Sequence, residues 1–252
     1  MHVVAIYGWK DEVAELAQAL SQALGLTLYE ARQRLIGGGP AVVARFAEPQ
    51  RAEALAAELE KGGVATLVLD ADARSRVTGS FLVRRFELGE SSLRLESTDG
   101  VGAEIAYREV AILISALRIS GQNESRTVTE RKFSLGRTVL SGGIPLTKTV
   151  TRQEEVATEE RTRLLYLFAG QRPRVVFRQS GMSYDGLGAA MKMSQELNFS
   201  FLTSELRRLC PAAVLDERLA NRSGQVRLLG PAQSFEGGLE LAAEILGRAL
   251  VR

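Results

Sequence analysis

The first 70 residues alternate short apolar runs with amphipathic stretches, and a glycine or proline stands at nearly every junction. The placement of these glycines and prolines constrains the fold more than any other feature of the chain. The β-branched run His2–Tyr7 predicts a strand that ends at Gly8. Asp11 then occupies an N-cap position ahead of apolar residues spaced three and four apart, and Gly25 follows them. A strand followed by one amphipathic helix is therefore predicted.

A second helix is predicted by Thr27 and Glu30, which have the spacing of a capping box. Glycines before Pro40 end this helix, and Pro49 opens a third helix after another apolar run. The predicted strands are Ala41–Phe46 and Val64–Leu69. The order strand, helix, helix, strand, helix, strand is enough for one small α+β domain over residues 1–70.

Beyond a polar linker at residues 71–79, the pattern changes to short strands joined by turns. Asp99 and Gly100 form a two-residue hairpin signal, and Asn198 stands where it would cap a helix. We expect a mainly antiparallel, partly open barrel over residues 80–222, with that helix closing one end. The predicted strands are Phe81–Phe86, Ser92–Glu96, Glu104–Tyr107, Val110–Ile119, Arg163–Phe168 and Arg174–Arg178.

A long polar insertion, residues 120–160, interrupts this second domain. Insertions of this length are usually mobile or functional, and we expect a solvated loop that orders against a partner. Its basic part contains Arg126, Arg131, Lys132, Arg137, Lys148 and Arg152. Residues 223–252 form a tail in which Leu239, Ala243, Leu246 and Leu250 mark an amphipathic helix.

The first domain resembles the C-terminal domain of the bacterial ribosomal stalk protein. The resemblance rests on Gly25–Arg32, Pro40 with Ala41, the run Ala52–Leu55 and the glycine before the last strand. It implies that fold, and it implies a face on the first two helices, basic in that family, that binds translation factors. The matching positions here are Gln18, Ser21 and Tyr29, with Arg32 as the remaining cation. Since such recognition depends on charge complementarity, the partner is left open.

The second domain is similar to bacterial pleckstrin-homology-like domains, which occur in multidomain proteins behind a small N-terminal module. The strand-rich layout and the closing helix carry this similarity. Members that bind phosphoinositides have cations in the first hairpin loop. The corresponding segment here, Leu88–Ser92, has none, so lipid binding at that loop is not predicted.

Chemistry-bearing residues are scarce, because the chain has a single histidine, His2, and a single cysteine, Cys210. Most catalytic and metal constellations are thereby excluded, and we expect no catalytic residue, metal or cofactor. The segment Gly181–Gly186 approaches a nucleophile elbow, but Asp185 stands where the motif needs glycine. Cys210, among apolar residues, is expected to be a buried thiol.

Trp9, Tyr29 and Arg32 are the predicted protein-binding residues, because aromatic and arginine side chains dominate interaction hot spots. We therefore predict a non-enzymatic interaction or regulatory protein, of bacterial type, whose partner is another protein. The lone cysteine and the lack of a signal-peptide pattern or a long apolar run predict a cytoplasmic location and no membrane contact.

Three alternatives remain open. The first is an enzyme or small-ligand protein with carboxylates and arginines in an interdomain pocket, for which Asp185 and Glu196 are the candidates. The second is weak nucleic-acid binding through the cations of the insertion, although the net charge is only +2. The third is self-association through Leu239, Leu246 and Leu250.

Overall fold

A computed structural model describes residues 1–9, 14–36, 38–70, 80–133, 147–230 and 235–251, with backbone alone for 120–133, 147–159, 235–237 and 251. The predicted linker 71–79 and the N-cap position Asp11 lie outside these residues. The chain divides into two compact units. One comprises Met1–Arg118 with Thr162–Arg252, and the other is Ile119–Arg161.

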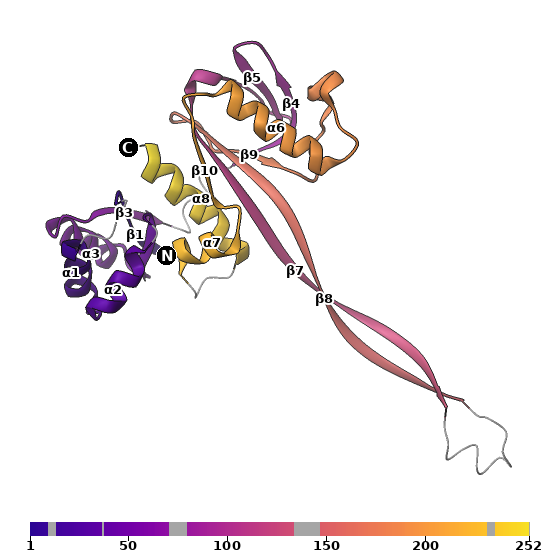
Figure 1. Ribbon diagram of the computed structural model, residues 1–252, viewed down its shortest axis with the longest axis horizontal. Coiled ribbons are helices and arrows are strands. Elements are labelled where there is room, and N and C mark those ends of the chain that lie inside the picture. Colours follow the sequence, from indigo (N-terminus) through magenta and orange to yellow (C-terminus); the bar gives the residue numbers. More distant parts are fainter. Residues whose placement is uncertain (10–13, 37, 71–79, 134–146, 231–234, 252) are drawn as a thin grey trace. The chain divides into compact units, whose positions relative to one another are not determined.

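The N-terminal elements follow the predicted order (Figure 1). The strands β1, β2 and β3 form an antiparallel sheet in the order β2-β1-β3. Helices and strands have these bounds: β1 His2–Tyr7, α1 Ala14–Leu24, α2 Leu28–Leu35, β2 Ala41–Phe46, α3 Pro49–Lys61 and β3 Ala65–Asp70. The last strand is one residue later than predicted.

Local signals account for the ends of these helices. The Thr27 amide donates to Glu30 Oε2 at 2.8 Å, and the Glu30 amide donates to Thr27 Oγ1 at 3.2 Å, so the predicted capping box is confirmed. Gly25, at φ 63°, adopts the left-handed conformation that ends α1. Pro49 is the first residue of α3, as predicted.

The three-stranded sheet is covered on both faces. Val4 and Ile6 of β1 pack with all three helices, whereas Ala5 of the same strand belongs to a different core cluster. Leu67 and Leu69 of β3 join Ala5 in that second cluster. Because alternate residues of a strand face opposite sides, this division means that apolar groups from elsewhere in the chain cover the second face.

Seven strands form the second sheet, in the order β10-β7-β8-β9-β4-β5-β6. The pairs β10·β7 and β4·β9 are parallel, and β8·β9, β4·β5 and β5·β6 are antiparallel. The fold is thus α+β, as predicted, with no closed barrel among the described residues. The bounds are β4 Phe81–Leu88, β5 Ser92–Ser97, β6 Gly102–Ala106, β7 Val110–Phe133, β8 Thr147–Ala169, β9 Val175–Arg178 and β10 Val214–Leu219.

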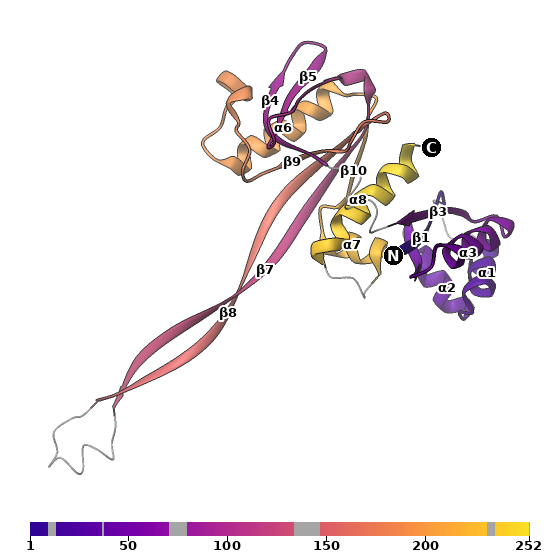
Figure 2. The ribbon, with the colours of Figure 1, turned by 180° about the vertical axis from the view of Figure 1, so that it is seen from behind.

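Short helices complete this part of the fold. Tyr107–Glu109 (η1) precedes β7, and Asp185–Ala190 (η2) precedes α6, Gln195–Leu209. Figure 2 shows α6 lying against strands β4, β5 and β9. Its Phe199, Leu202 and Leu206 are buried in a core with side chains of these strands, as the helical spacing predicted.

The predicted cap of α6 was wrong. Ser194 is the N-cap, and its Oγ accepts a hydrogen bond from the Leu197 amide at 3.2 Å. Asn198 lies inside the helix, where its buried side chain bonds both main-chain groups of Lys192: the Lys192 amide donates to Oδ1 at 2.6 Å, and Nδ2 donates to the Lys192 carbonyl at 3.0 Å. The N-cap is thus a serine four residues before Asn198, and the Asn198 side chain instead bonds the main chain of Lys192.

The C-terminal residues form two helices, α7 (Arg222–Leu229) and α8 (Phe235–Val251). The tail predicted over residues 223–252 contains the expected amphipathic helix, α8, but the prediction missed α7. Leu239 and Leu246 are 2% and 0% exposed, and Leu250 is partly buried against the same core. They cover apolar residues of both sheets, so the leucines proposed for self-association are occupied within the chain.

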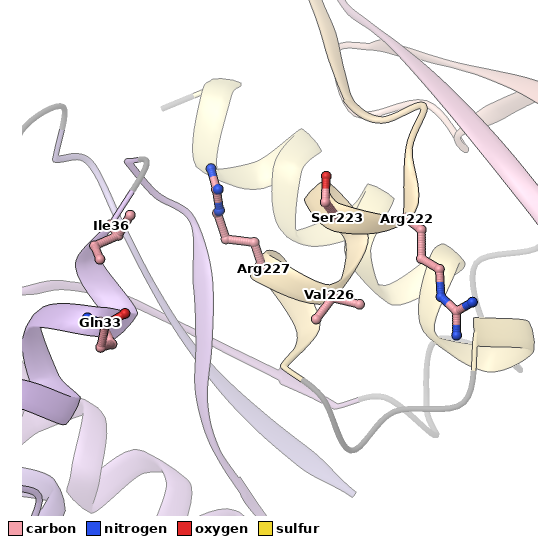
Figure 3. A pocket seen from close by; sticks show the side chains of 6 residues that line it. All are labelled: Gln33, Ile36, Arg222, Ser223, Val226 and Arg227. Carbon is pink, nitrogen blue, oxygen red and sulfur yellow. The ribbon is translucent and has the colours of Figure 1, made fainter.

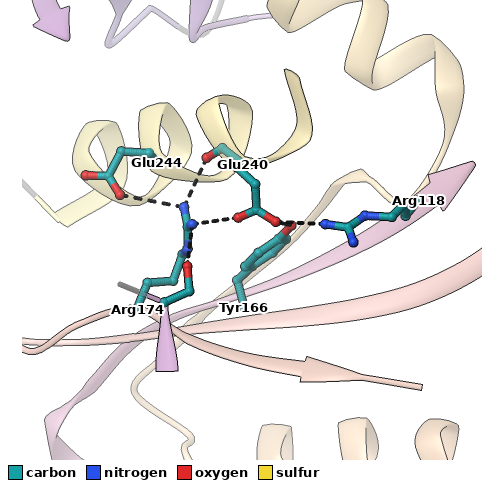
Figure 4. Close-up of polar contacts among 6 residues, drawn as sticks. Arg118, Tyr166, Arg174, Glu240 and Glu244 are labelled. Atoms are coloured by element: carbon teal, nitrogen blue, oxygen red, sulfur yellow. Dashed lines mark hydrogen bonds and ion pairs between the residues drawn. The ribbon is translucent and has the colours of Figure 1, made fainter. Parts of the chain in front are cut away.

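A charged network ties α8 to the seven-stranded sheet (Figure 4). Glu240 accepts from Arg118 Nη2 at 3.0 Å, Tyr166 Oη at 3.1 Å and Arg174 Nη2 at 2.6 Å. Glu244 lies 3.8 Å from Arg174 Nη1. Burial, and next the charge of Glu240, raise the pKa of Tyr166 far above its ordinary value, so its hydroxyl stays a donor.

The predicted loop over residues 120–160 was largely wrong. Apart from residues 134–146, which are outside the described part, its backbone belongs to the long strands β7 and β8. The sequence did not indicate these strands, because the insertion is polar throughout and a strand is recognised in a sequence mainly by alternating apolar residues. The boundaries of the second compact unit, Ile119–Arg161, lie within one residue of the predicted insertion.

Candidate functional site

Trp9 does not contribute to an exposed surface. Its side chain is 7% exposed and packs in the core beneath α1, α2 and α3. The indole N–H donates to the Leu35 carbonyl at 2.8 Å, which satisfies the end of α2. The prediction that Trp9 belongs to a binding trio is therefore replaced by a structural role.

Tyr29 and Arg32 lie on the exposed side of α2, opposite the buried Ala31 and Leu35. Tyr29 is 71% exposed, and Ile36, at the C-cap, is 45% exposed. Residues 29, 32, 33 and 36 are spaced three and four apart, so they form one stripe along the helix. We call Tyr29, Arg32, Gln33 and Ile36 the α2 stripe. It combines an aromatic, an aliphatic and a cationic side chain in solvent.

The α2 stripe continues into a pocket whose other wall is α7 (Figure 3). The pocket has a volume of about 660 Å³ and is lined by Gln33, Ile36, Arg222, Ser223, Val226 and Arg227. Figure 3 shows Arg227 on the side of α7 that faces α2, with Val226 beside it, and Arg222 at the other end of α7. Two lining residues are cationic and none of the six is acidic.

The α7 wall is fixed by polar contacts that end in the core. Gln225 is 2% exposed, and its Nε2 donates to the carbonyls of Leu117 and Leu219, each at 2.7 Å. At the start of the helix, Asn221 Oδ1 accepts from the Gly224 amide at 2.8 Å. Arg222, Val226 and Arg227 are therefore presented by a rigid element, which lowers the entropy cost of binding.

The position of α7 against the first domain is set by two arginines. Arg45 Nη2, from β2, donates to the Leu229 carbonyl at 2.7 Å. Arg218, which is paired with Asp216, donates from Nη1 to the Gly39 carbonyl just after α2. Burial lowers the pKa of Arg45 from its usual value. These hydrogen bonds join the first domain to α7 and to β10, the strand that precedes it.

Two charged side chains of α2, Glu30 and Arg34, form hydrogen bonds within the first domain. Glu30 has a lowered pKa, chiefly because the Thr27 backbone donates to its carboxylate. Arg34 donates from Nη1 to the Val43 carbonyl at 2.8 Å, holding α2 on β2. Arg32 and Arg222 each have an interaction partner within the chain as well. Arg227 is exposed and lies on the side of α7 that faces α2.

Of the basic insertion candidates, Arg137 lies outside the described residues. Arg126, Arg131 and Lys132 are in β7, and Lys148 and Arg152 are in β8. Only their backbone is described, so the prediction of nucleic-acid binding through them is untested.

The residues considered as catalytic candidates form hydrogen bonds or ion pairs with nearby side chains. Ser183 Oγ donates to Asp185 Oδ2 at 2.8 Å, which closes a turn before η2. Glu196 forms an ion pair with Arg163 at 3.0 Å in an exposed position. Cys210 is 2% exposed, and burial raises the pKa of its thiol to about 11, so the predicted buried thiol is confirmed. Asp185 and Glu196 are not found in the described pocket.

A second exposed apolar group lies before and at the start of α6. Met191, Met193 and Leu197 are 54%, 104% and 56% exposed. The hydrogen bonds of Asn198 to Lys192 hold the chain between the two methionines. This group shares no residue with the α2 stripe or the pocket.

The sequence interpretation missed Ile36 and the residues of α7. A signal for α7 was available, because Asn221 precedes a short amphipathic stretch that ends at Gly230. No signal could have placed that helix opposite Gln33 and Ile36, since the two segments are far apart in the chain.

The sequence matches no protein-family model, and comparisons with curated proteins and with solved structures give no match either. Within the described ranges, no helix is long and apolar enough to cross a membrane. The same residues contain no group of three or more His, Cys, Asp or Glu side chains placed to hold a metal ion.

Proposed function

We propose that this protein is a non-enzymatic interaction or regulatory protein that binds another protein through the α2 stripe. The observation that carries the proposal is the exposure of Tyr29, 71%, on a helix whose neighbouring stripe residues are Arg32 and Ile36. Tyrosine and arginine are enriched at interaction hot spots, because they combine large contact area with directed hydrogen bonds.

The rigidity of α2 supports this proposal. A capping box holds its first turn, and the Trp9 indole bonds its last turn. Arg34 fastens the same helix to β2. A surface that is already ordered loses little conformational entropy on binding, so its exposed side chains contribute more to affinity.

The proposal keeps the likeness of residues 1–70 to the ribosomal stalk domain, whose first two helices carry the binding face. The element order and the capping box of α2 support that likeness. We likewise propose that residues 80–222 are related to pleckstrin-homology-like domains and that the protein acts in the bacterial cytoplasm. Its one cysteine, free and buried, suits a reducing compartment.

Site-specific photo-crosslinking tests the proposal. A photoreactive phenylalanine analogue at position 29 should give a discrete crosslinked protein in cells, and the same analogue in place of Val101, which is 58% exposed, should not. Arg32→Glu should reduce the crosslink from position 29, whereas Arg108→Glu, at another exposed arginine, should leave it unchanged. Equal crosslinking from positions 29 and 101 would refute the proposal.

A further inference from the structure

We propose that the pocket between α2 and α7 binds an acidic peptide segment of the partner protein that carries one apolar side chain. The inference rests on the proposed function and deepens it, because it names the chemistry of the partner. Its basis is the combination of cationic and apolar groups in a single pocket, adjacent to the exposed Tyr29.

Charge selects an anionic occupant. Arg222 and Arg227 line the pocket, Arg32 belongs to the neighbouring stripe, and no lining residue is acidic. The guanidinium of Arg227 is exposed and faces α2. A guanidinium binds a carboxylate through two parallel hydrogen bonds, so Asp or Glu side chains are matched ligands.

Apolar contact selects a peptide over a simple anion. Ile36, 45% exposed, and Val226 face the same space from opposite helices. An aliphatic or aromatic side chain of the partner would remove both from water, and each such contact adds affinity in proportion to the area buried. A volume of about 660 Å³ accommodates one large side chain with its flanking peptide groups.

Nucleic acid fits this pocket less well. Sequence-independent binding of a phosphate backbone depends on several cations along the path of the strand. The pocket offers two arginines separated by Ser223 and Val226. A mixed cationic and aliphatic lining is instead what an acidic segment with an apolar anchor requires.

Fluorescence anisotropy with the full chain tests the inference. The probes are three ten-residue labelled peptides. The first has Asp and Glu flanking one Leu, the second has the same acidic sequence with Ser in place of Leu, and the third has Lys and Arg flanking one Leu. We expect saturable binding of the first peptide, binding at least about tenfold weaker for the second, and none for the third.

Pocket variants locate the binding. Arg227→Glu should weaken the first peptide at least about tenfold, Arg227→Lys should weaken it less, and Arg108→Glu should change it less than about twofold. Circular dichroism confirms that each variant is folded. A fourth probe, a labelled nonspecific DNA duplex, identifies the competing occupant.

The outcomes separate the two proposals. If the first peptide fails to bind, or binds equally to Arg227→Glu, the inference is overturned. It is also overturned if the duplex binds more tightly than the peptide and Arg227→Glu removes that binding. A crosslink from position 29 that persists in Arg227→Glu would then retain the proposed function while the acidic-segment inference is abandoned.

Discussion

Replacing Glu240 by alanine should destabilise the protein, because this half-buried carboxylate holds three donors in or beside the seven-stranded sheet. Its two carboxylate oxygens accept from Arg118, Tyr166 and Arg174 at 3.0, 3.1 and 2.6 Å. The Arg118 and Arg174 side chains are 28% and 14% exposed, and Tyr166 is fully buried. The substitution therefore leaves three donors, two of them charged, with little access to water.

The magnitude follows from how far the network is buried. Breaking a buried ion pair costs about 3–5 kcal/mol, but the Glu240 side chain is 36% exposed, which allows water to replace part of the loss. Arg174 also keeps Glu244, at 3.8 Å, and a bond to the Glu240 main-chain oxygen. We therefore expect a loss of about 2–3 kcal/mol for Glu240→Ala and about 1–2 kcal/mol for Glu240→Gln, which keeps an acceptor.

Urea denaturation followed by circular dichroism measures this loss as a lower midpoint at unchanged slope. The control is Glu87→Ala, which removes the partner of Arg94 at 3.2 Å in a pair whose side chains are both exposed. An exposed pair contributes about 0.2–1 kcal/mol, so the control should stay below about 1 kcal/mol. If Glu240→Ala loses no more than Glu87→Ala, the network does not hold α8 on the sheet and the reasoning is refuted.

Three further predictions concern other contacts. Gly224→Ala should disrupt the start of α7, since the added Cβ would overlap the main-chain oxygen of Arg218 in β10. Urea titration should show a loss of at least about 2 kcal/mol in the free energy of unfolding. Gly102→Ala is the matched control, because an added Cβ at that position has no neighbouring atom within 4 Å. Asn198→Ala should cost about 1–3 kcal/mol and speed hydrogen exchange at the Lys192 amide, and an unchanged exchange rate would contradict the contact at 2.6 Å. Because burial raises the pKa of Cys210 from 9.0 to about 11, the unfolded thiol ionises first and stability should fall as pH rises through that interval. Cys210→Ala should show a shallower fall in stability over the same pH range, and equal slopes would count against this titration.

The local geometry of the first domain was readable from sequence, because its signals join residues that are neighbours in the chain. Thr27 and Glu30 are three residues apart and bond each other in any chain that starts a helix there. The same reasoning failed at Asn198, because Ser194 is the residue that caps α6. The Asn198 side chain instead bonds Lys192, six residues earlier in the chain. Trp9 was misread for a related reason: its burial depends on where α2 ends.

Within the candidate site, the exposed side of α2 follows from local spacing, since the helical repeat separates Tyr29 and Arg32 from the buried Ala31 and Leu35. The placement of α7 opposite this helix depends instead on long-range packing. The hydrogen bond from Arg45 to Leu229 spans 184 residues, and no local pattern encodes such a pairing. The pocket exists because packing brings distant segments together, and that is determined by the whole core rather than by either helix.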